Sequence, residues 1–256
     1  MMQYIIGASL ITLNKKGMSM PLRHRGVHPK DAEYFAKDQL PKLATAVKEL
    51  SWLLGRGYSM KAALTLVGDH HQLATRQRLA VGRIACADGK IAARQAKCIS
   101  LETLKGREIL IDGFNLIITI ETALGDGAVF DCLDGCYRDL SSVYGSYRPV
   151  EETLPAIELI GNLLADCHPK QVHWLFDRPV SNSGRLAGMV QQLGDAHNWP
   201  FTTETTDRTD ALLAESKRIV VSCDSAILDH TAQWCNLARE VVTRSVPDAW
   251  IIDLKG

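Results

Sequence analysis

The sequence predicts an α/β protein with a mainly parallel, Rossmann-like sheet that carries helices on both faces and follows a small all-α domain. Three observations support this fold class. The run Arg107–Ile120 is β-branched and almost wholly apolar, as is typical of a strand buried on both faces. Short apolar runs then alternate with helical segments to the end of the chain, which is typical of right-handed crossovers in a parallel sheet. Before Gly106 the apolar residues follow helical spacing instead.

Beyond the first strand, four short apolar runs are expected to be strands. They are Gln171–Phe176, Trp199–Thr203, Arg218–Val221 and Trp250–Leu254. The segments between these runs have helical character, and we expect helices at Pro155–Asp166, Ser183–His197, Asp207–Glu215 and Ser225–Glu240.

The segment before Gly106 predicts several short helices. Asp31 is a good N-cap, Pro41 suits the first turn of the next helix, and Ser59 caps a third. A glycine-containing turn before the last helix is compatible with a helix-turn-helix arrangement. His70 and His71 fall in this turn, where exposed polar residues are common, and we assign them no metal role.

These patterns predict three segments. Residues 1–21 are expected to be disordered or a start-site extension, residues 22–106 a basic helical domain, and residues 107–256 the α/β domain. The charge divides in the same way. Residues 1–108 contain 18 Lys and Arg against 8 Asp and Glu, a net charge of +10, whereas residues 109–256 contain 11 against 21, a net charge of −10.

The basic half is expected to meet a polyanion. Arg76, Arg78 and Arg83 lie on the flanks of its last helix, where their guanidinium groups suit phosphate contacts. Two alternatives stay open, since the arginines also fit a solvated helical face, and the two halves also fit a pair of domains that neutralise each other across an interface.

The seven cysteines are scattered, without a CxxC pair or a histidine at zinc-site spacing. Free thiols in a reducing cytoplasm are therefore expected. The apolar stretch Tyr4–Leu13 is too short to cross a bilayer, so no membrane partner is expected.

Aspartates follow the predicted strands at the places where the strands end. Asp112, Asp177 and Asp224 each lie at the end of an apolar run, and Asp207 and Asp210 open the helix after another. In parallel sheets the ligand site lies outside the carboxyl ends of the strands. Any one of these residues could be a helix N-cap. Several acids at one edge instead predict a site for a hard cation, Mg²⁺ or Mn²⁺, because like charges repel unless a cation is present.

Four segments in this order resemble the PIN-like nucleases, especially their NYN branch. They are Ile111–Leu116 (IDGFNL), Phe176–Asp177, Thr206–Asp210 (TDRTD) and Val220–Asp224 (VVSCD). The resemblance covers about 115 residues. It implies a PIN-like fold and a metal-dependent endoribonuclease, acting on RNA rather than DNA. The helical half followed by this α/β half also resembles an uncharacterised prokaryotic family, which implies no particular substrate.

The resemblance implies roles for particular residues. Asp112, Asp177, Asp207, Asp210 and Asp224 would be catalytic, and all of these except Asp207 would hold the metal. Asn115 and Ser222 would orient the pocket. The stretch Gly125–Tyr147 has no counterpart in the NYN pattern, so we expect a structural insertion, or else a loop beside the site with Arg138 as a phosphate contact.

Three other functions fit less well. A haloacid-dehalogenase-type phosphatase needs a second aspartate two residues after the first, where this chain has Phe114. A nucleotide-binding regulator has little support, because the chain contains neither GxxxxGK[ST] nor GxGxxG. A nucleic-acid-binding adaptor or regulator that keeps the fold without cleaving stays open as the alternative.

Overall fold

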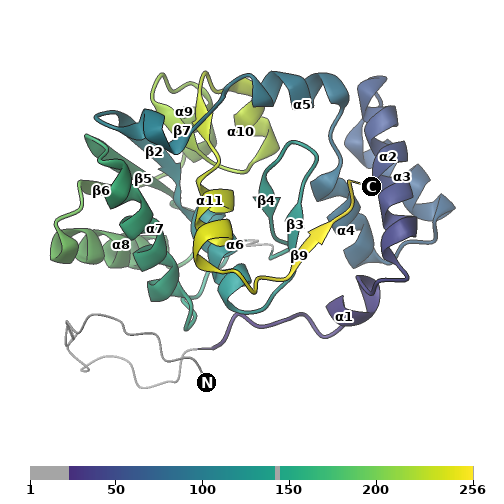
Figure 1. The fold of residues 1–256 in the computed structure, drawn as a ribbon, viewed down its shortest axis with the longest axis horizontal. Coiled ribbons are helices and arrows are strands. Elements are labelled where there is room, and N and C mark those ends of the chain that lie inside the picture. Colours follow the sequence, from purple (N-terminus) through teal and green to yellow (C-terminus); the bar gives the residue numbers. More distant parts are fainter. Residues whose placement is uncertain (1–22, 142–144, 256) are drawn as a thin grey trace.

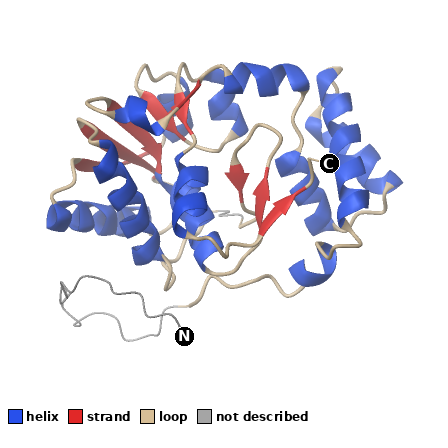
Figure 2. Cartoon of the chain, in the orientation of Figure 1, coloured by secondary structure: helices blue, strands red, loops and turns tan. Residues whose placement is uncertain are grey.

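The structure, a computed structural model, describes residues 23–141 and 145–255. Figure 1 shows the main sheet on one side, the N-terminal helices on the other and a small sheet between them, and Figure 2 separates the two sheets clearly. The expected disordered or extension segment, residues 1–21, lies outside the described residues. No helix within the described ranges is long and apolar enough to cross a membrane.

Within residues 23–141 and 145–255, the main sheet has six strands in the order β1-β8-β7-β2-β5-β6, and every neighbouring pair is parallel. These strands are β1 (Cys98–Ile99), β2 (Glu108–Asp112), β5 (Gln171–Asp177), β6 (Phe201–Thr206), β7 (Ile219–Val221) and β8 (Trp234–Cys235). This confirms the predicted α/β fold with a parallel sheet and a helical N-terminal region.

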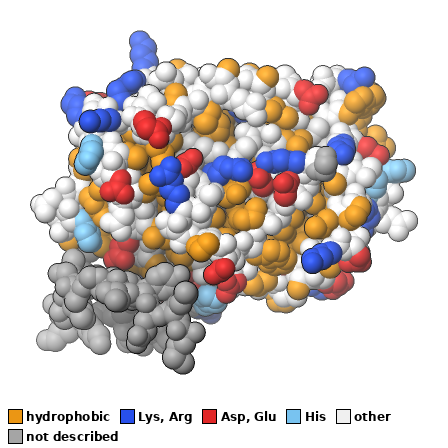
Figure 3. Space-filling model, in the orientation of Figure 1, with side chains coloured by type: hydrophobic (Ala, Val, Ile, Leu, Met, Phe, Trp, Pro, Cys, Tyr) orange, Lys and Arg blue, Asp and Glu red, His pale blue; other side chains and the backbone are white. Residues whose placement is uncertain are grey.

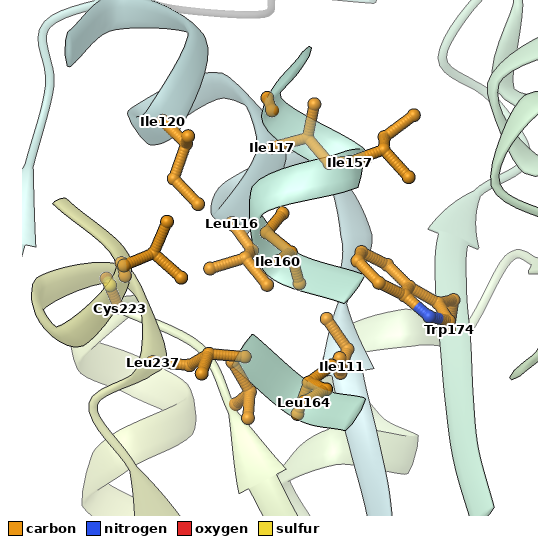
Figure 4. Close-up of a cluster of buried hydrophobic side chains, with 14 of the residues drawn as sticks. Ile111, Leu116, Ile117, Ile120, Ile157, Ile160, Leu164, Trp174, Cys223 and Leu237 are labelled. Atoms are coloured by element: carbon orange, nitrogen blue, oxygen red, sulfur yellow. The ribbon is translucent and has the colours of Figure 1, made fainter. Parts of the chain in front are cut away.

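Helices cover both faces of the sheet, because successive apolar side chains along its strands point to opposite faces and both faces are therefore apolar. Ile109 and Ile111 of β2 belong to the large core cluster on one face, whereas Leu110 belongs to a smaller cluster on the other. The helices on the first face are α6 (Gly113–Leu124), α7 (Thr153–Cys167), α8 (Ser183–His197) and α11 (Leu237–Ser245). The helices on the second face are α9 (Thr209–Ala214) and α10 (Ser225–His230). Figure 4 shows side chains of α6 and α7 meeting in the large cluster.

The chain changes direction at the centre of the sheet. β2 continues through β5 to β6 on one side, and the chain then returns to place β7 on the other side of β2. The helix after β2 packs on one face, and the helix after β7 packs on the opposite face. The connections that leave β2 and β7 therefore diverge to opposite faces and mark a topological switch point, where α/β sheets bind ligands.

The expected strand over Arg107–Ile120 is wrong in its second half. β2 ends at Asp112, and α6 begins at Gly113. A Cβ atom at Gly113 would overlap the ring of Phe176, so only glycine fits this close approach. The Asp112 carboxylate accepts a hydrogen bond from the Asn115 backbone N–H and caps the helix. The apolar run is thus a buried strand followed by a buried helix.

The expected single helix Ser225–Glu240 is also wrong, because α10 and α11 are separated by β8. The last predicted strand exists as β9 (Ile251–Asp253), but it lies in a second sheet, in the order β4-β3-β9. There β3 (Val129–Asp131) pairs antiparallel with β4 (Tyr137–Arg138) and parallel with β9. The stretch between α6 and α7 therefore contains a hairpin, and β9 adds a third strand to it.

The N-terminal helices are α1 (Asp31–Tyr34), α2 (Leu40–Gly55), α3 (Met60–His70), α4 (Thr75–Ile84) and α5 (Asp88–Gln95). A 3₁₀ turn, η1 (Leu101–Leu104), leads to β2. Ser59 caps α3 as expected, but Asp31 is not an N-cap, because α1 begins at Asp31 and Lys30 precedes it as the cap.

The helical part shares its core with the small sheet. Phe35 and Ile84 belong to one cluster with Phe130 and Ile252. The rings of Phe35 and Phe130 meet edge to face, with centroids 5.1 Å apart. The division at residues 106 and 107 stays a prediction, and the hydrophobic packing runs across it.

Candidate active site

A pocket of about 260 Å³ lies at the switch point, at the carboxyl ends of β2, β5 and β7. Four of the predicted aspartates line it, each from a different part of the fold. Asp112 ends β2, Asp177 ends β5, Asp210 lies in the first turn of α9, and Asp224 follows β7. The predicted orienting residue Asn115 lines it as well. Sheet topology therefore brings together acids that are more than 100 residues apart in sequence.

Hydrogen bonds fix the ends of β2 and β7 against each other. Ser222 donates from Oγ to Asp112 Oδ2 at 2.9 Å, and the same Oγ accepts from the Asp224 backbone N–H at 3.0 Å. Asn115 Oδ1 accepts from the Cys223 backbone N–H at 2.8 Å. Both side chains thus join the two strand ends beside the pocket, and their role in orienting its aspartates stays a prediction.

Burial differs among the carboxylates. Asp112 is 7% exposed, whereas Asp177 and Asp224 are half-buried and Asp210 is exposed. Burial raises the pKa of Asp112 to about 7, with a further contribution from the negative charges of Asp177 and Asp224. The hydrogen bonds from Ser222 and the Asn115 backbone oppose this rise. Burial, Asp177 and Asp224 also raise the pKa of Asp210.

Asp207 lies outside the pocket. Its side chain is 59% exposed and forms an ion pair with Arg178, with Oδ2 3.1 Å from Nη1. The acidic pair at the start of α9 is therefore divided, since Asp210 lines the pocket and Asp207 faces solvent.

The small sheet and the helical part complete the pocket wall. Arg138, Asp139 and Ser141 come from the hairpin, and Arg83 comes from α4. Asp139 accepts hydrogen bonds from Thr119 Oγ1 and from the Ser141 backbone, each at 2.7 Å.

Arg138 holds the hairpin against the end of β7 and is itself buried. Its Nε donates to the Cys223 carbonyl at 2.7 Å, and its two Nη atoms donate to Asp134 at 2.9 and 2.7 Å. Asp134 also accepts from Arg94 of α5 at 2.6 Å. Through these contacts the buried guanidinium of Arg138 holds the hairpin beside Cys223. Asp224 is the next residue, so the hairpin forms the pocket wall next to Asp224.

Two of the other three predicted phosphate-binding arginines have protein partners away from the pocket. Arg76 pairs with Asp31, whose side chain is buried. Arg78 donates to the Leu73 carbonyl at 2.9 Å and to Asp69 at 2.7 Å. By contrast, Arg83 is exposed and its guanidinium makes no hydrogen bond or ion pair with the residues that the structure describes.

Two features of the pocket could not be read from the sequence. Asp139 follows a two-residue strand in a stretch without periodic pattern, so nothing marked it as a fifth acid. Arg83 was singled out for its basic helix face, but its place beside the aspartates depends on packing between α4 and β3, which are distant in sequence.

The carboxylates of the pocket are more widely spaced than a closed metal cage. Among the described residues, one group of three or more His, Cys, Asp or Glu has all its ligand atoms within 4.8 Å, and that group, Glu49 with His70 and His71, lies elsewhere. Mg²⁺ keeps several of its waters and is usually held through one or two carboxylates together with substrate phosphates. Carboxylates at this wider spacing could hold a cation only together with water or substrate oxygens.

The chain matches two family models. Residues 101–240, more than half of its length, match "Domain of unknown function (DUF5616)", and residues 42–97 match "Protein of unknown function (DUF434)". The "Uncharacterized protein MJ0935" of Methanocaldococcus jannaschii is 32% identical over 183 residues, which is 72% of this chain and 87% of that relative. No solved structure gives a significant match. None of these descriptions states an activity, and the chain belongs to the DUF5616 family.

Proposed function

We propose that the protein is a metal-dependent nuclease, an endoribonuclease that hydrolyses phosphodiester bonds of RNA at the switch-point pocket. The observation that carries this proposal is the convergence of Asp112, Asp177, Asp210 and Asp224, from four different elements, on one pocket. N-caps alone do not account for this. Asp224 caps α10 and Asp112 caps α6, but Asp177 and Asp210 cap no helix.

The four aspartates would hold Mg²⁺ or Mn²⁺, which prefer oxygen ligands. A bound ion would supply activation of water and stabilisation of the leaving oxygen. The buried position of Asp112 supports a cation there, because burial and its acidic neighbours penalise its charged form and so raise its pKa to about 7. A nearby positive charge relieves that penalty.

The residues around the aspartates would orient and bind the substrate. Ser222 and Asn115 hold the ends of β2 and β7 in a fixed relation and so fix the directions of Asp112 and Asp224. Arg83 offers an exposed guanidinium at the same pocket, which suits a phosphate of the bound strand. The acidic side of the pocket would thus face the scissile phosphate, with a cation from α4 beside it.

The choice of RNA rests on the resemblance of four segments to the NYN branch, IDGFNL, Phe176–Asp177, TDRTD and VVSCD. A cytoplasmic location rests on the cysteines, because all seven are free and five of them are buried. Free buried thiols are typical of a reducing compartment.

Metal-dependent cleavage by the full chain tests the proposal. Short single-stranded RNA and DNA of the same sequence are incubated with wild type, Asp112→Asn, Asp224→Asn and Asp207→Asn, with Mn²⁺ or with EDTA. Both pocket variants should lose at least about a hundredfold in rate, the size seen when one group that stabilises transition-state charge is removed. Asp207→Asn is the matched control, because its exposed carboxylate lies outside the pocket, and it should cleave as wild type does.

Melting temperature separates loss of function from loss of fold. Asn keeps the volume and capping ability of Asp, so both pocket variants should melt at or above the wild-type temperature once repulsion among the acids is relieved. Wild-type protein that binds RNA but cleaves neither RNA nor DNA with any divalent metal would instead support the non-cleaving adaptor.

A further inference from the structure

Two adjacent histidines and a glutamate lie together on the helical part. His70 is the last residue of α3, His71 is its C-cap, and Glu49 lies in the neighbouring helix α2. One ligand atom of each residue lies within 4.8 Å of the others, and His71 Nε2 is 2.7 Å from Glu49 Oε2. Neither α2 nor α3 contributes to the aspartate pocket, so this cluster is separate from it.

The backbone after α3 holds the two imidazoles in place. The His71 N–H donates to the Val67 carbonyl at 3.0 Å, and the Leu73 N–H donates to the Gly68 carbonyl at 2.8 Å. Gln72 between them has a φ of +50°, a left-handed conformation that ends the helix abruptly. The two rings lie at 79° with centroids 4.7 Å apart. Both rings therefore stand beside Glu49 from a turn with fixed geometry.

A plain hydrogen bond accounts for only part of this cluster. The contact with Glu49 explains His71, whose side chain is 13% exposed, because it satisfies a ring nitrogen that is largely removed from water. It does not explain His70, which is exposed and makes no side-chain hydrogen bond with the described residues. A shared ligand would give all three side chains a common partner.

We propose that Glu49, His70 and His71 form a transition-metal site, of the class that binds Zn²⁺, which joins α2 to α3. Two imidazoles and one carboxylate are the donor set of open zinc sites, whereas Mg²⁺ prefers oxygen alone. Ligand atoms about 2.1 Å from a tetrahedral ion are about 3.4 Å apart. Reaching that geometry requires a small outward movement of Glu49, whose side chain is 43% exposed.

The site has three protein ligands and lies at the surface, so water or a fourth group from outside would complete the coordination. A bound ion would fix the C-terminal end of α3 against α2. Because an ion that binds only the folded state shifts the folding equilibrium, Zn²⁺ should raise the melting temperature in a concentration-dependent way. This inference does not depend on the nuclease proposal, since the two sites share no residue.

Titration of the metal-free full chain with Co²⁺, which reports tetrahedral coordination by its visible absorption, tests the site, with Zn²⁺ as competitor. Wild type should take up one Co²⁺ with that absorption, and Zn²⁺ should displace it. Glu49→Gln and His70→Ala change exposed or half-exposed side chains and should weaken binding by more than the roughly 10–100-fold that loss of an outer-shell partner costs. His71→Ala should do the same if it folds.

Two variants serve as matched controls. His230→Ala removes another exposed histidine at a helix C-terminus, and Asp112→Asn alters the aspartate pocket. Both should give the tetrahedral Co²⁺ absorption of wild type, whatever further Co²⁺ the aspartate pocket binds. The proposal is overturned if Glu49→Gln and His70→Ala give that absorption at the same Co²⁺ concentration as wild type, if His230→Ala weakens it equally, or if wild type shows no tetrahedral Co²⁺ absorption. Absence of nuclease activity would leave the result of this titration unaffected.

Discussion

Ser222 donates a hydrogen bond from Oγ to Asp112 Oδ2 at 2.9 Å, and thereby ties the end of β7 to the end of β2. The two residues are 110 positions apart in the sequence. Because the donor stabilises the charged carboxylate, it holds the pKa of Asp112 below the value that burial alone would give. Ser222 is therefore a positioning residue whose effect should be visible in the pH dependence of cleavage.

Ser222→Ala should shift the pH–rate profile of metal-dependent cleavage to higher pH. Without the hydroxyl donor the pKa of Asp112 rises further, so its carboxylate becomes ionised only at a higher pH. The profile is measured between pH 5 and 9 with Mn²⁺ in excess. Ser216→Ala is the control, because Ser216 Oγ accepts only from the Arg218 backbone in a turn away from the pocket. A uniform loss of rate with an unchanged profile would contradict this role.

Stability without metal should fall as the pH rises from about 4 to about 7. The pKa of Asp112 is raised from 3.8 to about 7 in the folded protein, so between these values the folded state keeps a proton that the unfolded state has released. The stabilising contribution is complete below about pH 4 and is lost by about pH 7, with a slope of about 1.4 kcal/mol per pH unit for one proton.

Urea unfolding at pH 5, 6, 7 and 8, in EDTA, measures this slope. Asp112→Asn should reduce the slope by the contribution of one proton because the amide does not titrate, whereas Asp207→Asn should keep the wild-type slope. Excess Mg²⁺ should flatten the slope of the wild type, since a bound cation favours the ionised carboxylate. If Asp112→Asn leaves the slope of the wild type unchanged, the pH dependence of stability comes from another titrating group.

Asp134→Asn should strongly destabilise the fold. Its carboxylate is fully buried between the guanidinium groups of Arg94 and Arg138, whose side chains are each 6% exposed. Removing one partner of a buried ionic network leaves uncompensated charge and typically costs about 3–5 kcal/mol. Urea unfolding checks this against Glu108→Gln, which breaks an exposed ion pair with Lys170 and should leave the midpoint unchanged. Equal midpoints for the two variants would contradict the buried network.

Arg83→Ala and Arg76→Ala should separate binding from stability. Arg83 lines the pocket and its guanidinium has no partner among the described residues, so its loss should weaken RNA binding and reduce the slope of log affinity against log salt by about 0.7 for one phosphate of a single strand. Arg76 pairs with the buried Asp31, so its loss should lower the free energy of unfolding and leave the salt slope unchanged. The two are compared by fluorescence anisotropy and urea unfolding of the full chain. If Arg76→Ala reduces the salt slope and Arg83→Ala lowers only the free energy of unfolding, the phosphate contact belongs to Arg76 and the prediction is wrong.

Figure 3 shows why the charge of the N-terminal half is a weak guide to a binding surface. On the face shown, Lys and Arg side chains are interspersed with Asp and Glu and with apolar side chains. Much of the positive charge is already paired within the protein, as in Arg94 with Asp134 and Asp229. A count of charges does not reveal which Lys and Arg side chains lack an acidic partner. The three-dimensional packing does reveal it.

The sequence predicted the parallel sheet well, because apolar runs at strand spacing and helices between them leave few topologies. Asp112, Asp177 and Asp224 were placed at one sheet edge for the same reason. The prediction from sequence failed where an apolar run had no periodicity to separate strand from helix. In ILIDGFNLIITI the change from strand to helix depends on Gly113 against the ring of Phe176. This contact joins the start of α6 to β5, and no local pattern contains it.

Short elements were lost for a related reason. β8 has two residues, Trp234 and Cys235, and its place in the sheet depends on pairing with β1, more than 130 residues earlier. β9 was expected as a strand, but which sheet it joins depends on its partner Phe130 in a stretch that was expected to be an insertion or a loop. Propensity identifies a strand and does not identify its neighbour.

The cluster that holds Phe35 and Ile84 together with Phe130 and Ile252 has a consequence for how the gene can be divided. A cut between residues 97 and 101, where the two family matches meet, would expose the apolar side chains of that cluster on both fragments. Each fragment alone should aggregate or stay unfolded, whereas co-expression should restore a complex of the two. The protein is therefore suited to split-protein reconstitution at this point and poorly suited to the transplantation of either half into another chain.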